Sequence, residues 1–298
     1  MKQAIRKPIL HQEDSFIVKQ AFDQHFFPHW HFHPELELFF VAKGSGTRFV
    51  GDAIEPFFEE DLVFVGSNLP HLWRSDAEYF KKNSGLSTQS IVVYFSADFL
   101  GDVFFDKKEL RHIKQLFALA SQRGLKIRGR THKSVSEKLQ DIAAIDNGLQ
   151  KLLLLLSILD EIAESKNCTP LASTGYLNTI RPDEADRMQQ IHEYVLKNFQ
   201  QKISIPDVAW LIGMSPTGFS RYFTATAHKT FSEFLIEIRI GHACKQLMNK
   251  EQSIAQIAYE SGFETLSNFN DQFKRRTGMK PLEYHKAQLA KDDHLTKL

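Results

Sequence analysis

The feature that most constrains this chain is a pattern near its C-terminal end that occurs twice. The first copy runs from Ser204 to Phe223, and the second runs from Ser253 to Phe273. The two starts are 49 positions apart and the two ends are 50 positions apart, so the copies have nearly equal length. Each copy has the spacing of a short helix, a glycine turn and a second, aromatic-rich helix. The pattern predicts a helical domain built from two similar units.

Single positions of the repeat support this interpretation. Ser204 and Ser253 stand where a hydroxyl can cap a helix N-terminus, and Gly213 and Gly262 stand where a sharp turn needs a positive φ. The first helix has an apolar stripe at i, i+3, i+4, i+7, formed by Ile205, Val208, Ala209 and Ile212. The aromatic residues expected to bury the second helices are Phe219, Tyr222, Phe223, Phe269 and Phe273. Such a unit is a helix-turn-helix, which places its second helix in the major groove of DNA. We therefore expect the C-terminal part to bind DNA.

The charge balance gives this expectation little support. The formal net charge of the 298 residues is +1, and from Asp183 onward 15 Lys and Arg stand against 14 Asp and Glu, again +1. A DNA-binding domain usually carries a basic patch. Lys274, Arg275 and Arg276 are clustered at the end of the second recognition helix. This cluster is either the phosphate-binding patch or a solvated helix face.

The composition also indicates a cellular setting. Cys168 and Cys244 are the two cysteines, and their separation fits neither a metal site nor a redox motif. The first residues lack the apolar run and cleavage site of a signal peptide. The longest leucine run, 152–156, is far shorter than the roughly 20 apolar residues that span a bilayer. We expect a reduced, cytoplasmic protein with no membrane segment.

Hydrophobic patterning divides the rest of the chain. Residues 15–96 contain short apolar runs separated by turn residues, as in a β-sandwich or barrel, at 36–41, 47–50, 62–65 and 91–95. Residues 98–165 have helical spacing, with stretches near 106–121, 131–145 and 148–165. The stretch 166–182 has no periodicity and is predicted as the linker. The expected domains are therefore 1–165 and 183–298.

The helix at 148–165 has a further possible role in assembly. Its apolar residues follow heptad steps of 3, 4, 3, 4, at Leu149, Leu152, Leu156, Leu159 and Ala163. Two copies of the chain paired along this seam would form a homodimer. The alternative is that the helix packs against its own β-domain, because Leu153, Leu154 and Leu155 make other faces apolar as well.

The C-terminal repeat resembles the AraC-type transcription regulators from about Glu184 to His285. The matching features are Ile257-Ala258, Gly262-Phe263, Asn268-Phe269, Phe273-Lys274, Gly278 and Pro281, with Phe234-Leu235, Arg239, Ala243 and Leu247 in a joining helix. This resemblance implies two helix-turn-helix units joined by a long helix. It also implies DNA contacts from Ser215, Thr217, Ser220, Arg221, Leu266, Ser267, Asn268, Asn270, Asp271, Lys274 and Arg275. Two positions depart from the family pattern, because His228 replaces a glycine and His285 replaces a frequent arginine.

Side-chain chemistry suggests a role for each contact. Arg221 can pair with guanine O6 and N7, and an exposed Asn can pair with adenine N6 and N7. Asp271 can accept a hydrogen bond from cytosine N4 or discriminate against other bases. The basic cluster suits phosphates, which position the protein without specifying sequence. For each Ser and Asn, helix capping or plain solvent exposure is the alternative.

The N-terminal part contains a group of histidines. His31, His33 and Glu37 have the same parity along an extended strand, and His71 follows a turn-rich segment. The spacing of these four residues resembles the two motifs of the cupin barrel, a fold also found in the effector domains of AraC-type regulators. Three interpretations stay open for the four residues. They form a small-molecule pocket, hold a divalent transition metal such as Zn, Fe, Mn or Ni, or are satisfied core residues. His25 and His29 are expected in loops or at the surface.

Two more residues are candidates for the same pocket. Arg48 can bind a carboxylate or phosphate, and Trp73 can stack on a sugar face. For both residues, a structural role as a salt-bridged Arg or a core Trp is the alternative.

Together these patterns predict an α+β multidomain fold. It consists of a cupin-like β-barrel with following helices and a C-terminal all-α domain of two helix-turn-helix units. The predicted function is sequence-specific transcription regulation under a small-molecule effector, with double-stranded DNA and a second copy of the chain as partners and no catalytic residues. The alternatives are a metal-dependent cupin enzyme, an oxygenase or isomerase using His31, His33, Glu37 and His71, and a protein-binding adaptor. The sequence identifies neither the effector, for which a sugar is one candidate, nor the promoter or the direction of regulation.

Overall fold

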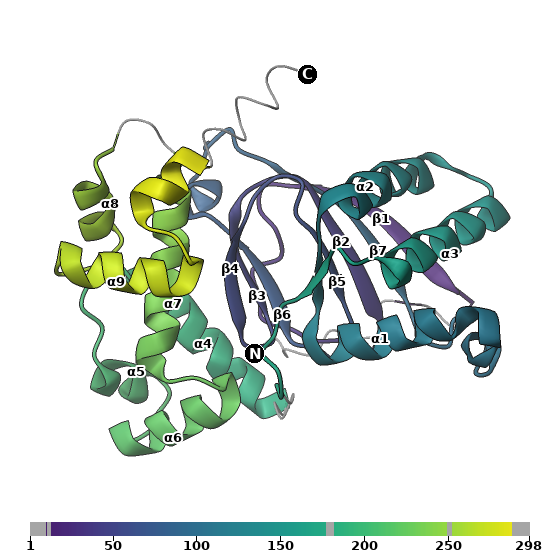
Figure 1. Cartoon of the computed structure of the whole chain (residues 1–298). Helices are drawn as coiled ribbons and strands as arrows, with labels where there is room; N and C mark the ends of the chain where they lie inside the picture. Colours follow the sequence, from purple (N-terminus) through teal and green to yellow (C-terminus); the bar gives the residue numbers. More distant parts are fainter. Residues whose placement is uncertain (1–9, 11–12, 177–181, 249–251, 288–298) are drawn as a thin grey trace. The chain divides into compact units, whose positions relative to one another are not determined.

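The computed structural model describes residues 10, 13–176, 182–248 and 252–287, and the statements below concern these residues (Figure 1). The main division of the chain into two compact units falls between Asp186 and Arg187. The β-strands and three α-helices precede this division, and from Arg187 onward the described residues contain only helices. The expected α+β multidomain class is confirmed at this level. No helix within the described ranges combines the length and apolarity that crossing a membrane requires.

The first unit contains two separate sheets. The larger has six strands in the order β1-β7-β2-β5-β8-β9, and the smaller has the order β4-β3-β6. The strand bounds are β1 Phe16–Asp23, β2 Leu36–Lys43, β3 Gly46–Val50, β4 Ala53–Phe57, β5 Leu62–Val65, β6 His71–Ser75, β7 Thr88–Phe95, β8 Leu125–Ile127 and β9 Cys168–Pro170. All five described pairings within the large sheet are antiparallel, and register partners such as Leu38 and Val93 set β2 against β7.

The central strand β2 shows how the sequence produces this arrangement. Leu36, Leu38 and Phe40 point to one face, whereas Phe39 and Val41 point to the other, and all five are buried. A strand covered on both sides needs apolar residues at successive positions. This explains why 36–41 reads as a continuous hydrophobic run.

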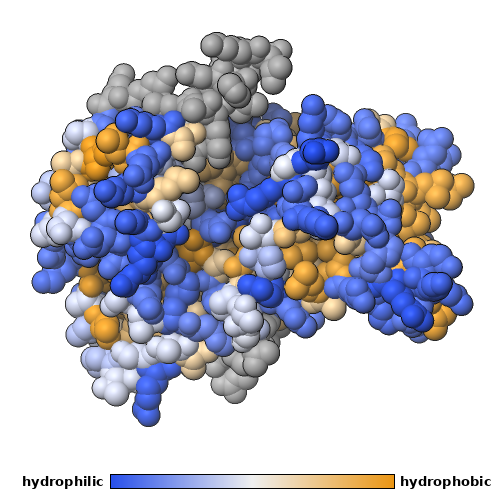
Figure 2. Space-filling model, in the orientation of Figure 1, coloured by the Kyte–Doolittle hydropathy of each residue, from blue (hydrophilic) through white to orange (hydrophobic). Residues whose placement is uncertain are grey.

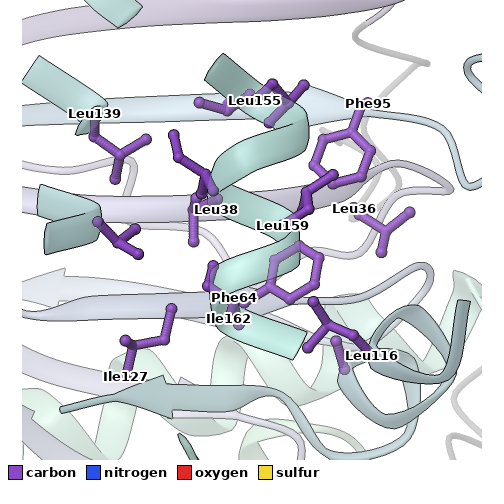
Figure 3. Close-up of a cluster of buried hydrophobic side chains, with 14 of the residues drawn as sticks. Leu36, Leu38, Phe64, Phe95, Leu116, Ile127, Leu139, Leu155, Leu159 and Ile162 are labelled. Carbon is purple, nitrogen blue, oxygen red and sulfur yellow. The ribbon is translucent and has the colours of Figure 1, made fainter. Parts of the chain in front are cut away.

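Helices cover one face of the large sheet. They are α1 Arg111–Arg123, α2 Gly129–Ala144 and α3 Gly148–Glu164, preceded by short 3-10 turns at Ala77–Phe80, Phe104–Asp106 and Lys108–Leu110. Figure 3 shows Leu155, Leu159 and Ile162 of α3 facing the strand residues Leu38 and Phe64. Burial of each such side chain stabilises the fold by about 1.5–3 kcal/mol. The three helical stretches predicted from periodicity are therefore confirmed, with small shifts at their ends.

The small sheet packs on the opposite face of the large one. Trp73 of β6 stacks on Phe39 of β2 with ring centroids 4.3 Å apart, and Val50 and Phe57 join the same buried cluster. Because sheets packed in this way lie about 10 Å apart, their backbones are too distant to pair. The described residues therefore form a two-sheet sandwich with one backbone bridge, His31 to His71, outside the named strands. The sheets do not close into a barrel, so the predicted cupin-like barrel is not confirmed.

The stretch predicted as a linker is partly a component of the first unit. β9 pairs with β8, and Ala172 and Tyr176 are buried beyond it. The backbone N–H of Ser173 donates to Asp52 Oδ1 at 2.8 Å. Residues 166–176 therefore belong to the sandwich, and the remainder of the predicted linker, 177–181, lies outside the described residues.

The second unit consists of helices α4 Pro182–Asn198, α5 Ile205–Leu211, α6 Pro216–Ala227, α7 Phe231–Gln246, α8 Ile254–Glu260 and α9 Leu266–Thr277. α5 with α6, and α8 with α9, are the two predicted helix-turn-helix units. Ser204 and Ser253 cap α5 and α8, and Gly213 and Gly262 have φ values of 68° and 87°. The capping and turn predictions are confirmed.

The long helix α7 joins the two helix-turn-helix units through its buried residues. Near its start, Phe231 and Phe234 pack against Phe223 of α6. Towards its end, Ala243 and Leu247 belong to the buried cluster that contains Phe269 of α9. One continuous helix therefore contributes to the cores of both helix-turn-helix units.

Candidate functional site

The exposed face of α6 is the first candidate DNA-reading surface. Phe219 and Phe223 are fully buried and pack α6 against the rest of its helix-turn-helix unit. Thr217 and Arg221 lie one turn apart on the opposite face and are exposed. Arg221 forms no hydrogen bond or ion pair with any other residue that the structure describes. Its guanidinium is therefore free to bind an external acceptor.

Two serines of the same helix differ from Arg221 in this respect. Ser215 is the N-cap of α6, and its Oγ accepts a hydrogen bond from the Gly218 N–H at 3.1 Å. The hydroxyl of Ser220 donates to the carbonyl oxygen of Pro216 at 3.0 Å. Ser215 therefore caps the helix, which was the alternative to DNA contact for this residue. Both hydroxyls already have partners within the helix, so Thr217 and Arg221 carry the stronger case for DNA contact.

α9 presents the second candidate surface. Phe269 and Phe273 are buried. The exposed predicted contacts on this helix are Ser267, Asn268, Asn270, Asp271, Lys274 and Arg275. Leu266 is half-buried and packs against the core cluster, and the N-cap is Thr265 rather than Ser267. Leu266 is therefore placed as a core-edge residue.

The basic cluster at the end of α9 is not uniform. Lys274 and Arg275 are exposed, whereas Arg276 is half-buried and donates from Nη1 to Gln272 Oε1 at 2.6 Å. Lys274 and Arg275 are consequently the two cations of this cluster that can approach phosphates.

The repeat places opposite charges at equivalent positions. Arg221 and Asp271 are 50 residues apart, which is the offset of the second helices, and each lies near the centre of its exposed face. An arginine pairs with guanine, whereas a carboxylate accepts from cytosine N4 and is repelled by phosphate. The two helix-turn-helix units therefore present different reading chemistry.

The two departures from the family pattern also have definite places. His228 follows α6 in the left-handed conformation with a φ of 53°, so it takes up the glycine geometry itself. The Nδ1–H of His285 donates to the carbonyl oxygen of Leu247. That imidazole is occupied inside the domain.

A buried cluster in the first unit brings together His31, His33, Glu37 and His71. Each of the four has one potential ligand atom, and these atoms all lie within 4.8 Å of one another. Oε2 of Glu37 is 2.9 Å from Nε2 of His33 and 3.1 Å from Nε2 of His71. The backbone bridge between His31 and His71 fixes two of the imidazoles side by side. The predicted convergence of these four residues is present in the structure, and His25 and His29 are not members of the group. The single extended strand on which the parity argument depended is absent, because a bend at 34–35 separates the two histidines from β2.

The protonation behaviour of the cluster reflects its burial and its charges. Burial alone would lower the pKa of His33, but hydrogen bonds to Glu35 and Glu37 and their negative charges outweigh it and raise that pKa to about 9. Burial would raise the pKa of Glu37, but the charge of His71 and hydrogen bonds from His33 and His71 hold it well below its usual range. Glu37 is therefore a carboxylate at neutral pH.

Arg48 and Trp73 share the inward face of the small sheet, where they are register partners. Arg48 is only 1% exposed and forms a buried ion pair with Asp61. Burial raises the pKa of Asp61, but the charges of Arg48 and Lys126 outweigh that effect and lower it. Trp73 is occupied by its stacking on Phe39. Both residues thus have the structural roles that were weighed as alternatives to ligand binding.

Comparison with known proteins decides what the second unit is. Residues 208–287 match the family model of a helix-turn-helix domain. Relatives include uncharacterised HTH-type transcriptional regulators from three bacteria. The one from Pseudoalteromonas carrageenovora is 34% identical over 91 residues, which cover 30% of this chain and 54% of that protein. The one from Bacillus subtilis is 27% identical over 103 residues, or 35% of each chain. The one from Staphylococcus aureus N315 is 29% identical over 99 residues, or 33% of this chain and 13% of the relative.

The C-terminal part of this chain contains a helix-turn-helix domain. The alignments span only 13% of the length of the Staphylococcus aureus regulators and 35% of the Bacillus subtilis one, so the family assignment concerns this domain. Among solved structures, ToxT from Vibrio cholerae O395 covers 91% of this chain and 97% of its own at 15% identity and a TM-score of 0.36. The DNA-binding domain of AdpA, solved with a target DNA, covers 34% and 91% at 23% identity and a TM-score of 0.33. At these scores the assignment rests on the family match.

The helix-turn-helix domain contains an anchoring residue, Arg239, whose role could not be seen in the sequence. Arg239 of α7 donates from Nε to the Phe199 carbonyl and from Nη2 to the Gln201 carbonyl, both at 2.8 Å. Gly262 lies against the same loop, since a Cβ there would come within 2.6 Å of the Phe199 oxygen. The turn of the second helix-turn-helix unit is therefore fixed to the segment that follows α4. An arginine in a mostly apolar helix was the only sequence signal for this role.

Proposed function

We propose that this chain is a sequence-specific DNA-binding transcription regulator whose two recognition helices, α6 and α9, read adjacent parts of one operator. The observation that carries the proposal is the pair of exposed helix faces built on the shared helix α7. Their central residues, Arg221 and Asp271, are exposed and equivalent in the repeat. The relatives described above are named as transcriptional regulators, which supports the proposal. A promoter-binding role fits the cytoplasmic location expected from the sequence.

The difference between Arg221 and Asp271 gives the proposal a specific form. A guanine-reading group and a cytosine-reading group at equivalent positions favour an operator whose two parts differ in sequence. Lys274 and Arg275 would add phosphate contacts beside the second part only. We expect the complex to be sensitive to salt, with each phosphate contact contributing a slope of about −0.9 to log K against log [salt].

Selection of bound sequences by the full chain from a random double-stranded library tests this function. The expected result is one enriched, non-palindromic motif that survives excess random competitor at about 150 mM salt. Enrichment no greater than that of a bead-only control would refute the proposal. Asp271→Ala should lose selection at one position of the motif while binding random DNA more tightly, because a repulsion from phosphate is removed.

A homodimer is a second part of the proposal. α3 buries Leu155, Ile158, Leu159 and Ile162 against its own sheet, so Leu159 of the predicted heptad seam is not available to a partner. Leu149 and Leu153, one turn apart, are 65% and 58% exposed. Figure 2 shows hydrophobic atoms gathered over this end of α3. The seam offered to a second copy is therefore shifted to the first turns of the helix.

Control by a small-molecule effector in the first unit remains part of the proposal. Arg48 and Trp73 are engaged with Asp61 and Phe39, so a sugar stacked on Trp73 has no support from the geometry. The support that remains comes from the buried cluster of His31, His33, Glu37 and His71. No observation on this cluster favours catalysis over binding, and the relatives' names favour a regulator over a cupin enzyme.

A further inference from the structure

We propose that the second unit contains a binding site for a small organic anion with a flat apolar body, in a cavity between its two helix-turn-helix units. The cavity has a volume of about 450 Å³, and its lining residues all belong to the second unit. Cavities that bind small molecules measure roughly 300–1,000 Å³, so this one lies within their range. The proposal depends neither on DNA binding nor on the buried cluster of the first unit.

Hydrogen bonds hold the walls of this cavity in place. One wall is the segment 200–203 before α5, another is the end of α8 with the turn at 262–264, and α7 forms the third side. Arg239 of α7 donates to two carbonyl oxygens of the segment before α5, both at 2.8 Å. Gln200 Nε2 donates to the carbonyl oxygen of Glu260 at 2.9 Å, which joins the first two walls directly. The cavity is therefore formed before any ligand binds, as small-molecule sites usually are.

The charged groups of the lining favour an anion. Lys202 is exposed and forms no hydrogen bond or ion pair with any residue that the structure describes. Arg239 uses Nε and Nη2 for the two carbonyl oxygens, so its Nη1 has no partner within the described ranges. Burial lowers the pKa of Arg239, and the negative charge of Glu264 opposes that shift. Because two cations stand against this one carboxylate among the lining residues, the cavity has one positive charge in excess.

The rest of the lining is mostly apolar. Leu235 and Phe263 are buried, and Ile203 is half-buried. The side chain of Tyr259 is 56% exposed, and its hydroxyl has no partner in the described parts of the chain. Such a ring can stack on the flat face of a ligand, and covering the three aliphatic and aromatic side chains favours binding further. An inorganic anion would leave these groups uncovered, so an organic anion fits the cavity better.

Titration of the full-length protein with anilinonaphthalene sulfonate tests the proposal, because this aromatic sulfonate becomes strongly fluorescent in apolar sites. We expect about one equivalent per chain, with a dissociation constant on the order of 10–100 µM. Lys202→Glu reverses the charge of an exposed side chain and should weaken binding by about tenfold or more. The matched control is Lys197→Glu, which changes an exposed lysine of α4 outside the lining and should bind as the unaltered protein does.

A second pair of variants separates the cavity from exposed aromatic surface in general. Tyr259→Ser should weaken binding of the sulfonate by about fivefold or more. Trp210 is the equivalent residue of the first repeat and is 84% exposed, but it lies outside the lining, so Trp210→Ser should bind normally. Phenylnaphthylamine, which lacks the sulfonate, should bind more weakly and respond equally to Lys202→Glu and to Lys197→Glu.

Amide exchange in the unaltered protein gives a readout that does not depend on any variant. Bound sulfonate should slow exchange in 200–203 and 259–264, and not at the start of α3, where Leu149 and Leu153 are also exposed. Equal binding by Lys202→Glu and Lys197→Glu would overturn the proposal, as would a loss of binding in Trp210→Ser but not in Tyr259→Ser. Complete displacement of the sulfonate by inorganic phosphate would overturn the apolar part of the assignment.

Discussion

Replacing Arg221 with alanine is the most informative single change in the recognition surface. The side chain is exposed and has no hydrogen bond or ion pair with the described residues, so its removal should leave the stability of the domain within about 0.5 kcal/mol. A bidentate contact to guanine contributes about 1–3 kcal/mol of discrimination. At 1.4 kcal/mol per factor of ten, this predicts a loss of about 5- to 150-fold in affinity for the selected operator.

The neighbouring residue provides a matched control. The hydroxyl of Ser220 is bonded to Pro216 within α6, so Ser220→Ala should change operator affinity less than about twofold. The assay is fluorescence anisotropy with the selected operator and with operators altered at one base pair at a time. Arg221→Ala should lose its preference at a single base pair and keep it at the others. Equal affinity of Arg221→Ala and the unaltered protein for every operator would refute the assignment, as would a larger effect of Ser220→Ala.

Three further predictions concern stability and assembly. Gly262→Ala should destabilise the second unit more than Gly213→Ala. Both glycines have a positive φ, which costs an alanine about 1–2 kcal/mol. Only at Gly262 would the new Cβ also collide with backbone atoms, which adds about 1–3 kcal/mol. Amide exchange in α8–α9 and α5–α6 measures this, and equal losses would contradict it. Burial lowers the pKa of His192 to about 3, whereas the same side chain in the unfolded chain binds a proton below about 6.5. The free energy of unfolding should therefore decrease as the pH falls from 6.5 towards 3, by up to about 1.4 kcal/mol per pH unit. His192→Phe should reduce this acid sensitivity in urea unfolding, and an unchanged pH profile would count against it. Leu149→Lys with Leu153→Lys should give a monomer in sedimentation with an unaltered melting temperature, whereas a persistent dimer would exclude this end of α3 as the interface.

The elements that the sequence predicted well are those whose pattern is local. The repeat predicted the two helix-turn-helix units correctly, because helix caps, turn glycines and buried aromatic residues each depend on a few adjacent positions. Ser204 and Gly213 behave in the structure as their residue types suggest. The strands at 36–41 and 62–65 were visible because burial on both faces requires uninterrupted apolar residues.

The features that the sequence did not predict depend on contacts between distant segments. β9 lies in a stretch rich in Ser, Thr and Pro, and only its pairing with β8 makes it a strand. Whether the strands close into a barrel depends on which edges meet, and hydrophobic alternation is the same in a barrel and in a sandwich.

The candidate sites show the same limit. His31, His33 and Glu37 do come together, but through a bend at 34–35 and not along the one extended strand that parity assumed. Arg48 was assigned to a pocket because nothing near it in the sequence reveals its pairing with Asp61. The hydrogen bond of Ser220 to its own helix was likewise hidden, because an exposed and a back-bonded serine look alike in a sequence.

Methylation interference on the selected operator tests the central claim most directly. Two helix-turn-helix units on one connecting helix should contact two successive major-groove segments on one side of the duplex, about one helical turn apart. We predict two short blocks of guanines whose N7 methylation prevents binding, with the block read by α6 disappearing in Arg221→Ala. A single block, or interference spread evenly along the DNA, would contradict the account.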